Sequence, residues 1–375
     1  LAGRSVARGT GDSMHHVSAL PPVVWSDAVL RHEPRSEVWV GVVTPATEVP
    51  DRARVLRDHL VAAGAALTPA TEHDDTVLRR VHRPELLDHL RTVAGEWARG
   101  EYQELVGQDR VVPYFFVTDG MLDGLPQHPA AAVHARAGEF CYDTMTLVGP
   151  GTWEAARAAV DVALTAADLV LGGAPAAYAL TRPPGHHATS RAFGGSCYLN
   201  NAAVAAEALT DGGCTRVAVV DVDAHHGNGT QAIFWQRPDV FFASLHVDPG
   251  AGWFPHVVGH ADERGAGDGL GTTLNEPLAP GTGDAGWLAA LDRLLGRVGP
   301  FAPDALVVSL GVDAAAADPE SPLQVSAAGF RRAGELLAGL GVPTVLVHEG
   351  SELLAVVNGL RAGVSPNPRR VPLSC

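Results

Sequence analysis

Three side chains that could hold a metal ion occur at alternate positions near the middle of the chain. In the segment RVAVVDVDAHHGNGTQ, Asp221, Asp223 and His225 stand where an apolar run ends. Side chains of a strand alternate between its two faces, so residues spaced by two share one face. A carboxylate and an imidazole are ordinary zinc ligands, and an open catalytic site needs a third protein ligand and a position for water. We therefore expect a metal site here, completed from a neighbouring strand end.

Two further segments supply polar side chains at predicted strand ends. In ALVVSLGVDAAAADPE, Asp313 follows an apolar run directly, at the strand end where open α/β sheets bind their ligands, and it is predicted to be the third metal ligand. Tandem His186 and His187 lie on a proline-rich turn, RPPGHHA, which could aim two imidazoles at the metal site. Each residue alone is as typical of a cap or a turn, but the set favours a catalytic metal centre.

The apolar runs are nearly continuous, a pattern typical of parallel strands covered by helices on both faces. The predicted strands are Val38–Val43, Ala176–Thr181, Val217–Val222, Val240–His246, Ala305–Val312 and Pro343–Val347. The predicted helices are Ala53–Ala65, Pro84–Arg99, Thr152–Leu171, Asn201–Leu209, Ala285–Val298 and Ala327–Leu340. This βαβα alternation predicts a three-layer αβα fold around a central, mainly parallel sheet.

Two long segments fit neither pattern: Glu101–Phe140, with scattered Pro, His and Tyr, and the Gly-rich Pro249–Gly283. Long loops in compact domains tend to be functional, so the first is expected to border a pocket or to form a homodimer contact. A single catalytic domain is predicted over residues 14–362. Residues 1–13 are expected to be a disordered extension and 363–375 a flexible tail.

Composition excludes several classes of function. The 375 residues are 46% hydrophobic, and the formal charge of −15 comes with scattered basic residues, which argues against a nucleic-acid surface and suits a cationic substrate better. The four cysteines (Cys141, Cys197, Cys214 and Cys375) form no CxxC pair. No run of eighteen apolar residues predicts a membrane span, and we expect a cytoplasmic protein.

Four segments, TRPPGHHAT, GGSCYLNNAA, DVDAHHGNGTQ and LGVDAAAADPES, resemble the successive motifs of the histone deacetylase superfamily, which includes bacterial acetylpolyamine amidohydrolases. The likeness runs from about Trp25 to Gly350, and HEPRSEVWVGVVTPATEVPDR and AGEFCYDTMT are similar to the bacterial amidohydrolase branch. The resemblance implies the arginase/deacetylase fold. It also implies a zinc-dependent deacetylase of small acetylated amines, acetylpolyamines ahead of acetyl-lysine.

The resemblance assigns roles to individual residues. It implies zinc on Asp223, His225 and Asp313, proton handling by His186 and His187, orientation of the first histidine by Asp221 and pairing of the second with Asn228. It further implies a potassium ion at Asp221, Ser244 and Leu245. Because Asn228 is neutral, no adjacent anion stabilises an imidazolium, and His187 is predicted to be less basic than it would be beside an aspartate.

Two departures from related patterns matter. Gly227 and Gly311 stand where the two-metal arginases carry further carboxylates, which makes an arginase-like ureohydrolase the weaker alternative. Family members also place a tyrosine after the last core strand, where its hydroxyl bonds the oxyanion. Here Glu352 stands at the aligned place, and no Tyr follows Tyr198.

Loss of one oxyanion donor costs about 10²–10³ in turnover. We therefore expect reduced activity or, as an alternative, a zinc-containing protein that binds acyl amines with little catalysis. A misread or truncated end is the other interpretation of Glu352.

The pocket wall is predicted from residue types alone. Ser196 replaces an aromatic residue found in many relatives, so another residue should form the wall. The candidates for the wall and rim are Phe193, Gly195, Ser196, His246, Trp253 and Phe254, with Glu139 and Asp143 expected to meet a cationic substrate tail. His15, His16 and His348 are predicted to take no part.

Overall fold

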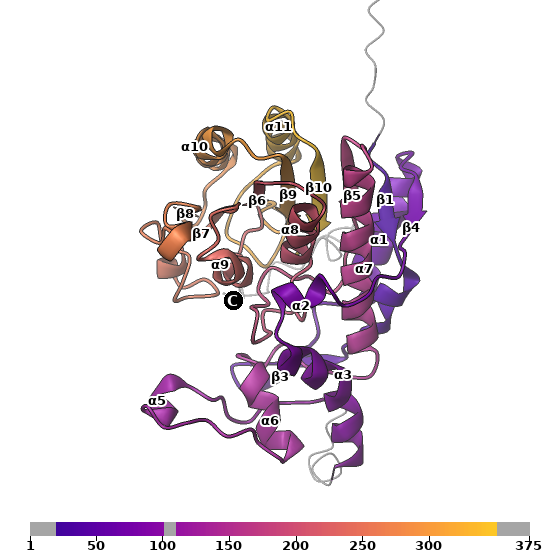
Figure 1. Ribbon diagram of the computed structural model, residues 1–375, viewed down its shortest axis with the longest axis vertical. Coiled ribbons are helices and arrows are strands. Elements are labelled where there is room, and N and C mark those ends of the chain that lie inside the picture. Colours follow the sequence, from indigo (N-terminus) through magenta and orange to yellow (C-terminus); the bar gives the residue numbers. More distant parts are fainter. Residues whose placement is uncertain (1–19, 101–109, 351–375) are drawn as a thin grey trace, which may run out of the picture.

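The computed structural model describes residues 20–100 and 110–350, and its centre is an eight-stranded sheet (Figure 1). The strand order is β4-β1-β5-β10-β9-β6-β7-β8, and every neighbouring pair in it is parallel. The strands are β1 (Val23–Trp25), β4 (Leu67–Pro69), β5 (Ala176–Ala179), β6 (Val217–Asp221), β7 (Val240–Val247), β8 (Thr273–Leu278), β9 (Ala305–Leu310) and β10 (Thr344–His348).

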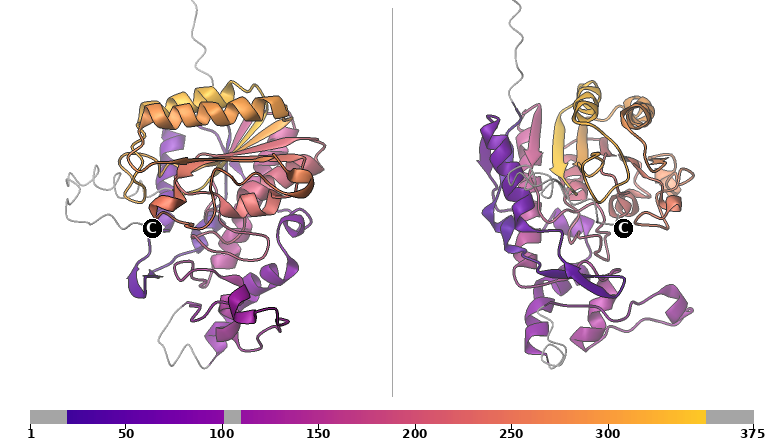
Figure 2. Two further views of the ribbon diagram at one scale, coloured as in Figure 1. Left: turned by 90° about the vertical axis from the view of Figure 1, so that its left-hand side faces the viewer. Right: turned by 180° about the vertical axis from the view of Figure 1, so that it is seen from behind.

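Helices cover both faces of the sheet, which explains why its central strands are mostly apolar on both faces. On β6, Val217 and Val219 belong to one buried cluster, with side chains of α7 (Thr152–Leu171) and α8 (Asn201–Asp211). Ala218 and Val220 belong to a second cluster, with side chains of α10 (Asp284–Phe301) and α11 (Ala327–Ala338). Figure 2 shows α10 and α11 side by side along one face. The predicted three-layer fold is confirmed.

The remaining helices lie around this core. They are α1 (Pro50–Ala62), α2 (Leu78–Val81), α3 (Pro84–Arg99), α5 (Asp119–Leu122), α6 (Val133–Phe140) and α9 (Asn228–Phe234), with short 3₁₀ turns at Asp27–Arg31, Pro249–Ala251 and Gly267–Gly269. The predicted bounds of α3 and α7 agree with the structure, while α1 begins three residues earlier than predicted because Pro50 occupies its first turn. No helix within 20–100 or 110–350 is long and apolar enough to cross a membrane.

Three predictions about secondary structure were wrong. Val38–Val43 is not a strand of the central sheet. It belongs to a separate antiparallel hairpin of β2 (Ser36–Trp39) and β3 (Val42–Pro45), which turns where Val40 and Gly41 adopt positive φ. Its apolar residues stay outside the core, and Val40 is 80% exposed. The Gly-rich segment Pro249–Gly283 contains β8, whose polar residues suit a sheet edge. The segment Glu101–Phe140 contains α5 and α6, and its residues 101–109 lie outside the described residues.

Strand order brings distant parts of the sequence to one place. β5, β10, β9 and β6 are consecutive neighbours, and parallel pairing puts all their carboxyl ends at one edge. Asp221, the last residue of β6, pairs in register with Ser244 of β7 and Ser309 of β9. The loops after these strands therefore meet, as expected where open α/β sheets bind ligands.

Candidate metal centre and active site

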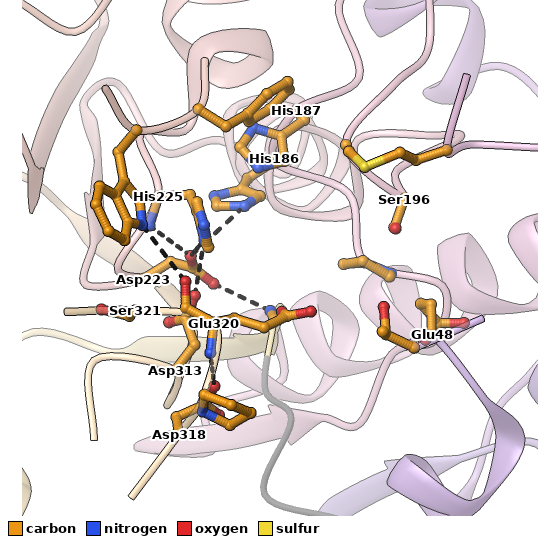
Figure 3. A pocket seen from close by; sticks show the side chains of 18 of the residues that line it. Glu48, His186, His187, Ser196, Asp223, His225, Asp313, Asp318, Glu320 and Ser321 are labelled. Atoms are coloured by element: carbon orange, nitrogen blue, oxygen red, sulfur yellow. Dashed lines mark hydrogen bonds and ion pairs between the residues drawn. The ribbon is translucent and has the colours of Figure 1, made fainter. Parts of the chain in front are cut away.

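Asp223, His225 and Asp313 come together in the loops after β6 and β9. One ligand atom from each lies within 4.8 Å of the other two. His225 Nδ1 is 2.9 Å from Asp313 Oδ2 and 3.4 Å from Asp223 Oδ1. Both aspartates are 1% exposed. Figure 3 shows the three side chains directed toward a common point at one side of the cavity.

Backbone N–H groups fix the orientation of both carboxylates. The N–H groups of His225 and Gly350 donate to Oδ1 and Oδ2 of Asp223, at 2.9 and 3.0 Å, and that of Ala224 donates to Asp313 Oδ1 at 2.8 Å. Supporting hydrogen bonds of this kind orient metal ligands.

The charges also fit a cation. Burial and the nearby carboxylate of Asp223 raise the pKa of Asp313 to about 7. Two buried acids this close need a cation to ionise together, and two carboxylates with one imidazole match a catalytic zinc donor set.

The tandem histidines lie beside this centre, with their ring centroids 4.0 Å apart. His186 Nδ1 is 3.0 Å from Asp221 Oδ2, and His187 Nδ1 is 2.7 Å from Asn228 Oδ1. Carboxylate and carboxamide oxygens only accept hydrogen bonds, so both Nδ1 atoms carry hydrogen.

The two histidines differ in basicity. Burial lowers the pKa of His186, but the Asp221 and Asp223 carboxylates outweigh it and raise this pKa to about 10. Burial and the adjacent His186 hold the pKa of His187 well below its ordinary value. The first ring therefore holds a proton at neutral pH, and the second is neutral.

Gly227 and Gly311 leave no room for the further carboxylates of a two-metal arginase. A Cβ on Gly227 would lie 2.2 Å from Asp221 Oδ2, and one on Gly311 would lie 1.9 Å from Asp223 Oδ2. At both positions the backbone approaches a site carboxylate so closely that any side chain would displace it. The geometry thus argues against an arginase-like dinuclear centre.

The end of β10 is a part of the site that sequence reasoning missed. Glu349 Oε2 accepts hydrogen bonds from the backbone N–H groups of Gly185 and His186, at 2.7 and 3.1 Å, and Glu349 is 1% exposed. Next to it, Gly350 donates to Asp223 and accepts from the Val312 N–H at 3.0 Å. Two consecutive residues thus tie together the loops after β5, β6 and β9. The HEG segment was visible in the sequence, but its partners depend on strand order.

The centre opens into a cavity of about 650 Å³. Its floor is lined by the three candidate metal ligands together with His186 and His187. Gly195, Ser196 and Trp253 line it as the sequence suggested, as does Phe254, whose ring lies 4.8 Å from His187 in edge contact. Sequence reasoning missed the contributions of the β2–β3 hairpin and of the 318–324 loop, which include Glu37, Trp39, Asp318 and Glu320.

Four predicted pocket residues do not line the cavity. Glu139 accepts a hydrogen bond from the Ala130 N–H at 2.7 Å, and Phe193 is packed in the core beside Tyr198. Asp143 is occupied by backbone N–H groups, among them that of Gly195 at 2.6 Å. His246 is fully buried between Ser244 and the Gly259 carbonyl. Each makes a local structural contact that residue type alone did not reveal.

The remaining sequence predictions concern residues away from the cavity or outside the described residues. Ser244 and Leu245 are fully buried on β7 next to Asp221, where the family resemblance implied potassium. His348 is buried and bonded to the Tyr178 hydroxyl, away from the large cavity. Glu352, His15, His16, the 1–13 extension and the 363–375 tail lie outside the described residues.

Comparison with known proteins agrees with this geometry. The histone deacetylase domain profile matches residues 46–352. The chain is 40% identical to the acetylpolyamine amidohydrolase of Mycoplana ramosa over 330 residues, covering 88% of this chain and 94% of that protein. It is 42% identical to acetylpolyamine amidohydrolase 1 of Pseudomonas aeruginosa over 333 residues, covering 87% and 92%.

A crystal structure of acetylpolyamine aminohydrolase from Burkholderia pseudomallei superposes with a TM-score of 0.83 at 39% identity, covering 92% of this chain and 96% of that one. The chain belongs to the histone deacetylase family and is accordingly a hydrolase of amide bonds. Within the family it falls in the branch of the bacterial acetylpolyamine amidohydrolases.

Proposed function

We propose that this chain is a zinc-dependent deacetylase of small acetylated amines, acetylpolyamines ahead of acetyl-lysine. The observation that carries the proposal is the Asp223–His225–Asp313 group, open to a cavity whose floor also holds His186 and His187. Three protein ligands with an open position are the donor set of catalytic zinc. Bound zinc would polarise the acetyl carbonyl and make water more acidic.

The two histidines divide the proton transfers. Nδ1–H of His187 donates to Asn228, which leaves Nε2 as the acceptor for the proton of the attacking water. His186 holds its proton beside Asp221 and is the closer of the two rings to Asp223, with its Nε2 3.9 Å from Asp223 Oδ1. As an imidazolium it stabilises negative charge that develops on the substrate, and a histidine returns a proton to the departing amine.

The rim of the cavity supports a cationic substrate. Its acidic side chains include Glu37, Asp318 and Glu320. Among the described lining residues the arginine is Arg52, which is bound to Glu48 at 3.0 Å. Trp39, Met145, Trp253 and Phe254 provide apolar walls for a methylene chain. An acetylated diamine combines a neutral amide, a methylene chain and a distant ammonium, which are the features this surface accommodates.

The substrate proposal is tested by comparing N-acetylated diamines with an acetyl-lysine peptide and a neutral acetyl amide, on zinc-loaded protein and on protein stripped by a chelator. We expect hydrolysis only with zinc, and the highest kcat/KM for the acetylated diamine. Equal kcat/KM for the neutral amide would remove the support for a cationic substrate. Hydrolysis that survives complete zinc removal would contradict the metal-dependent mechanism.

The residue at position 352 bears on the rate. Glu352 stands where relatives carry the tyrosine that donates to the oxyanion, and an ionised carboxylate repels that charge, so we propose that turnover is reduced. Replacing Glu352 by Tyr should raise kcat by about 10²–10³ with little change in KM. Unchanged kcat in the variant would mean that another donor already acts. Substrate affinity without measurable turnover in the natural sequence would favour the binding-protein alternative.

Three smaller proposals remain. Potassium at Asp221, Ser244 and Leu245 should raise the thermal stability in potassium chloride above that in choline chloride.

A homodimer is supported by exposed apolar side chains of the 110–140 segment, such as Tyr114 (71%) and Leu125 (70%), and light scattering tests it. A cytoplasmic location is supported by Cys141, Cys197 and Cys214, which are free thiols.

A further inference from the structure

A second group of metal-binding side chains lies next to the first. Ligand atoms of His186, Cys197 and Glu349 all lie within 4.8 Å of one another. They come from the loop after β5, from the turn that precedes α8, and from the end of β10. Their exposed fractions are 2%, 0% and 1%. A thiol, an imidazole and a carboxyl group so close together in the protein interior form a possible donor set for a divalent ion.

The donor types predict which ion this group takes. A dication would be balanced by the Cys197 thiolate and the Glu349 carboxylate, with the imidazole as a neutral ligand. Binding releases the thiol proton, one proton from the His186 imidazolium and any proton on the carboxyl group. Thiolate favours soft and borderline ions, whereas the two carboxylates of the Asp223–His225–Asp313 group also accept harder ones. The two groups therefore differ in selectivity although they are neighbours.

The surroundings supply further hydrogen bonds and an approach from the large cavity. The His187 backbone N–H donates to the Cys197 sulfur, and Ser309 Oγ donates to Glu349 Oε1 at 3.2 Å. His186 lines the large cavity, through which an ion could reach the group.

We propose that His186, Cys197 and Glu349 form a second site, for a thiophilic divalent cation, whose occupation inhibits the enzyme. The inhibition part of this proposal rests on the proposed function, in which both ring nitrogens of His186 make contacts that the reaction uses. Nδ1 carries the hydrogen bond to Asp221, and Nε2 faces Asp223. An ion bound to Nδ1 replaces the hydrogen bond to Asp221, and an ion bound to Nε2 occupies the nitrogen that faces Asp223. Zinc above one equivalent, or cadmium, should therefore inhibit a zinc-loaded enzyme.

The test uses the full chain loaded with one equivalent of zinc, in a Cys214→Ala and Cys375→Ala background that removes two other thiols. Cadmium is added, and bound metal is counted after equilibrium dialysis while the ultraviolet charge-transfer band of a cadmium thiolate is recorded. We expect a second bound ion together with the band. Cys197→Ala should lose both, and Glu349→Gln should bind the second ion more weakly. Cys141→Ala is the matched control, since it removes a buried thiol outside both metal groups, and it should keep both.

Two results would overturn the proposal. One is a background protein that takes up no second ion, and the other is a Cys197→Ala variant that binds it with the band unchanged. Neither readout needs a substrate, so the site can be judged even if the proposed deacetylation fails. Where turnover is measurable, excess cadmium should abolish it in the Cys141→Ala protein and spare it in Cys197→Ala.

Discussion

At the floor of the cavity the side chains are fixed by the sheet, whereas at its rim they are carried by a hairpin and loops. Asp223, Asp313 and His186 are 1%, 1% and 2% exposed. Backbone N–H groups from other strand ends hold the two aspartates, and the Asp221 carboxylate holds the ring of His186. The rim includes the β2–β3 hairpin, where Val43 is 63% exposed. Under the proposed function, the difference teaches that the reaction depends on strand register, while substrate choice depends on segments that can change without disturbing the sheet.

The sharpest way to test this division is to remove a ligand from the floor. Asp313→Ala should lose its bound zinc and nearly all activity. The loss should exceed the ~10–100-fold that removal of a supporting hydrogen bond costs. Metal analysis and kcat/KM provide the measurement, and Asp292→Ala on the exposed face of α10 is the control. If Asp313→Ala still binds one equivalent of zinc, Asp313 is not a zinc ligand.

A change that leaves every ligand in place can still disturb the floor. In Gly311→Ala the new methyl group would meet the Asp223 carboxylate, so zinc affinity should fall by about 10–100-fold. Gly296→Ala is the matched control, because a Cβ there meets nothing within 4 Å. Competition with a chromogenic chelator measures both affinities. Equal affinity in the two variants would show that the floor is less rigid than its contacts imply.

A smaller effect is expected from the charge beside the second histidine. Asn228→Asp places an anion 2.7 Å from His187 Nδ1 if the geometry is kept, and an adjacent opposite charge raises a histidine pKa by about 1–3 pH units. Because His187 must be unprotonated to accept a proton, activity at low pH should be lost first. The acidic limb of the kcat/KM profile should therefore move to higher pH. If the acidic limb does not move, it reports the ionisation of a group other than His187.

The smallest effects belong to the rim. Glu37→Gln and Glu320→Gln should each raise KM for an acetylated diamine only a few-fold, since partly exposed ion pairs contribute ~0.2–1 kcal/mol. kcat should change little, and a neutral acetyl amide should not distinguish the variants. Glu154→Gln, exposed on α7, is the control. A large fall in kcat from either rim substitution would show that the rim also contributes to the chemical step.

Sequence reasoning reached the floor more successfully than the rim, for physical reasons. Asp223 and His225 follow an apolar run at a spacing of two, so strand periodicity alone predicts that they share a face. Glu349 could not be found this way, because its role depends on β10 lying between β5 and β9. The local sequence shows that a strand ends at His348, and it does not show the neighbours of that strand.

The rim and the short strands were hidden for a different reason. Val38–Val43 has the composition of a buried strand, yet tertiary context leaves it in a hairpin that only Gly41 hinted at. β1 and β4 have three residues each, too few to show a pattern. Glu139 and Phe193 were assigned to the pocket by residue type, which does not reveal their local contacts with Ala130 and Tyr198.

The strand order also governs when this protein can become active during its synthesis. Thr181 Oγ1 donates to the carbonyl of His348 across 167 positions, and the Gly350 N–H reaches Asp223 across 127. A nascent chain that has emerged only as far as the loop after β9 holds all three proposed metal ligands but leaves a gap between β5 and β9 where β10 belongs. Pairings this distant in sequence form slowly. The sheet and the site beside it are thus complete only once β10 lies between β5 and β9.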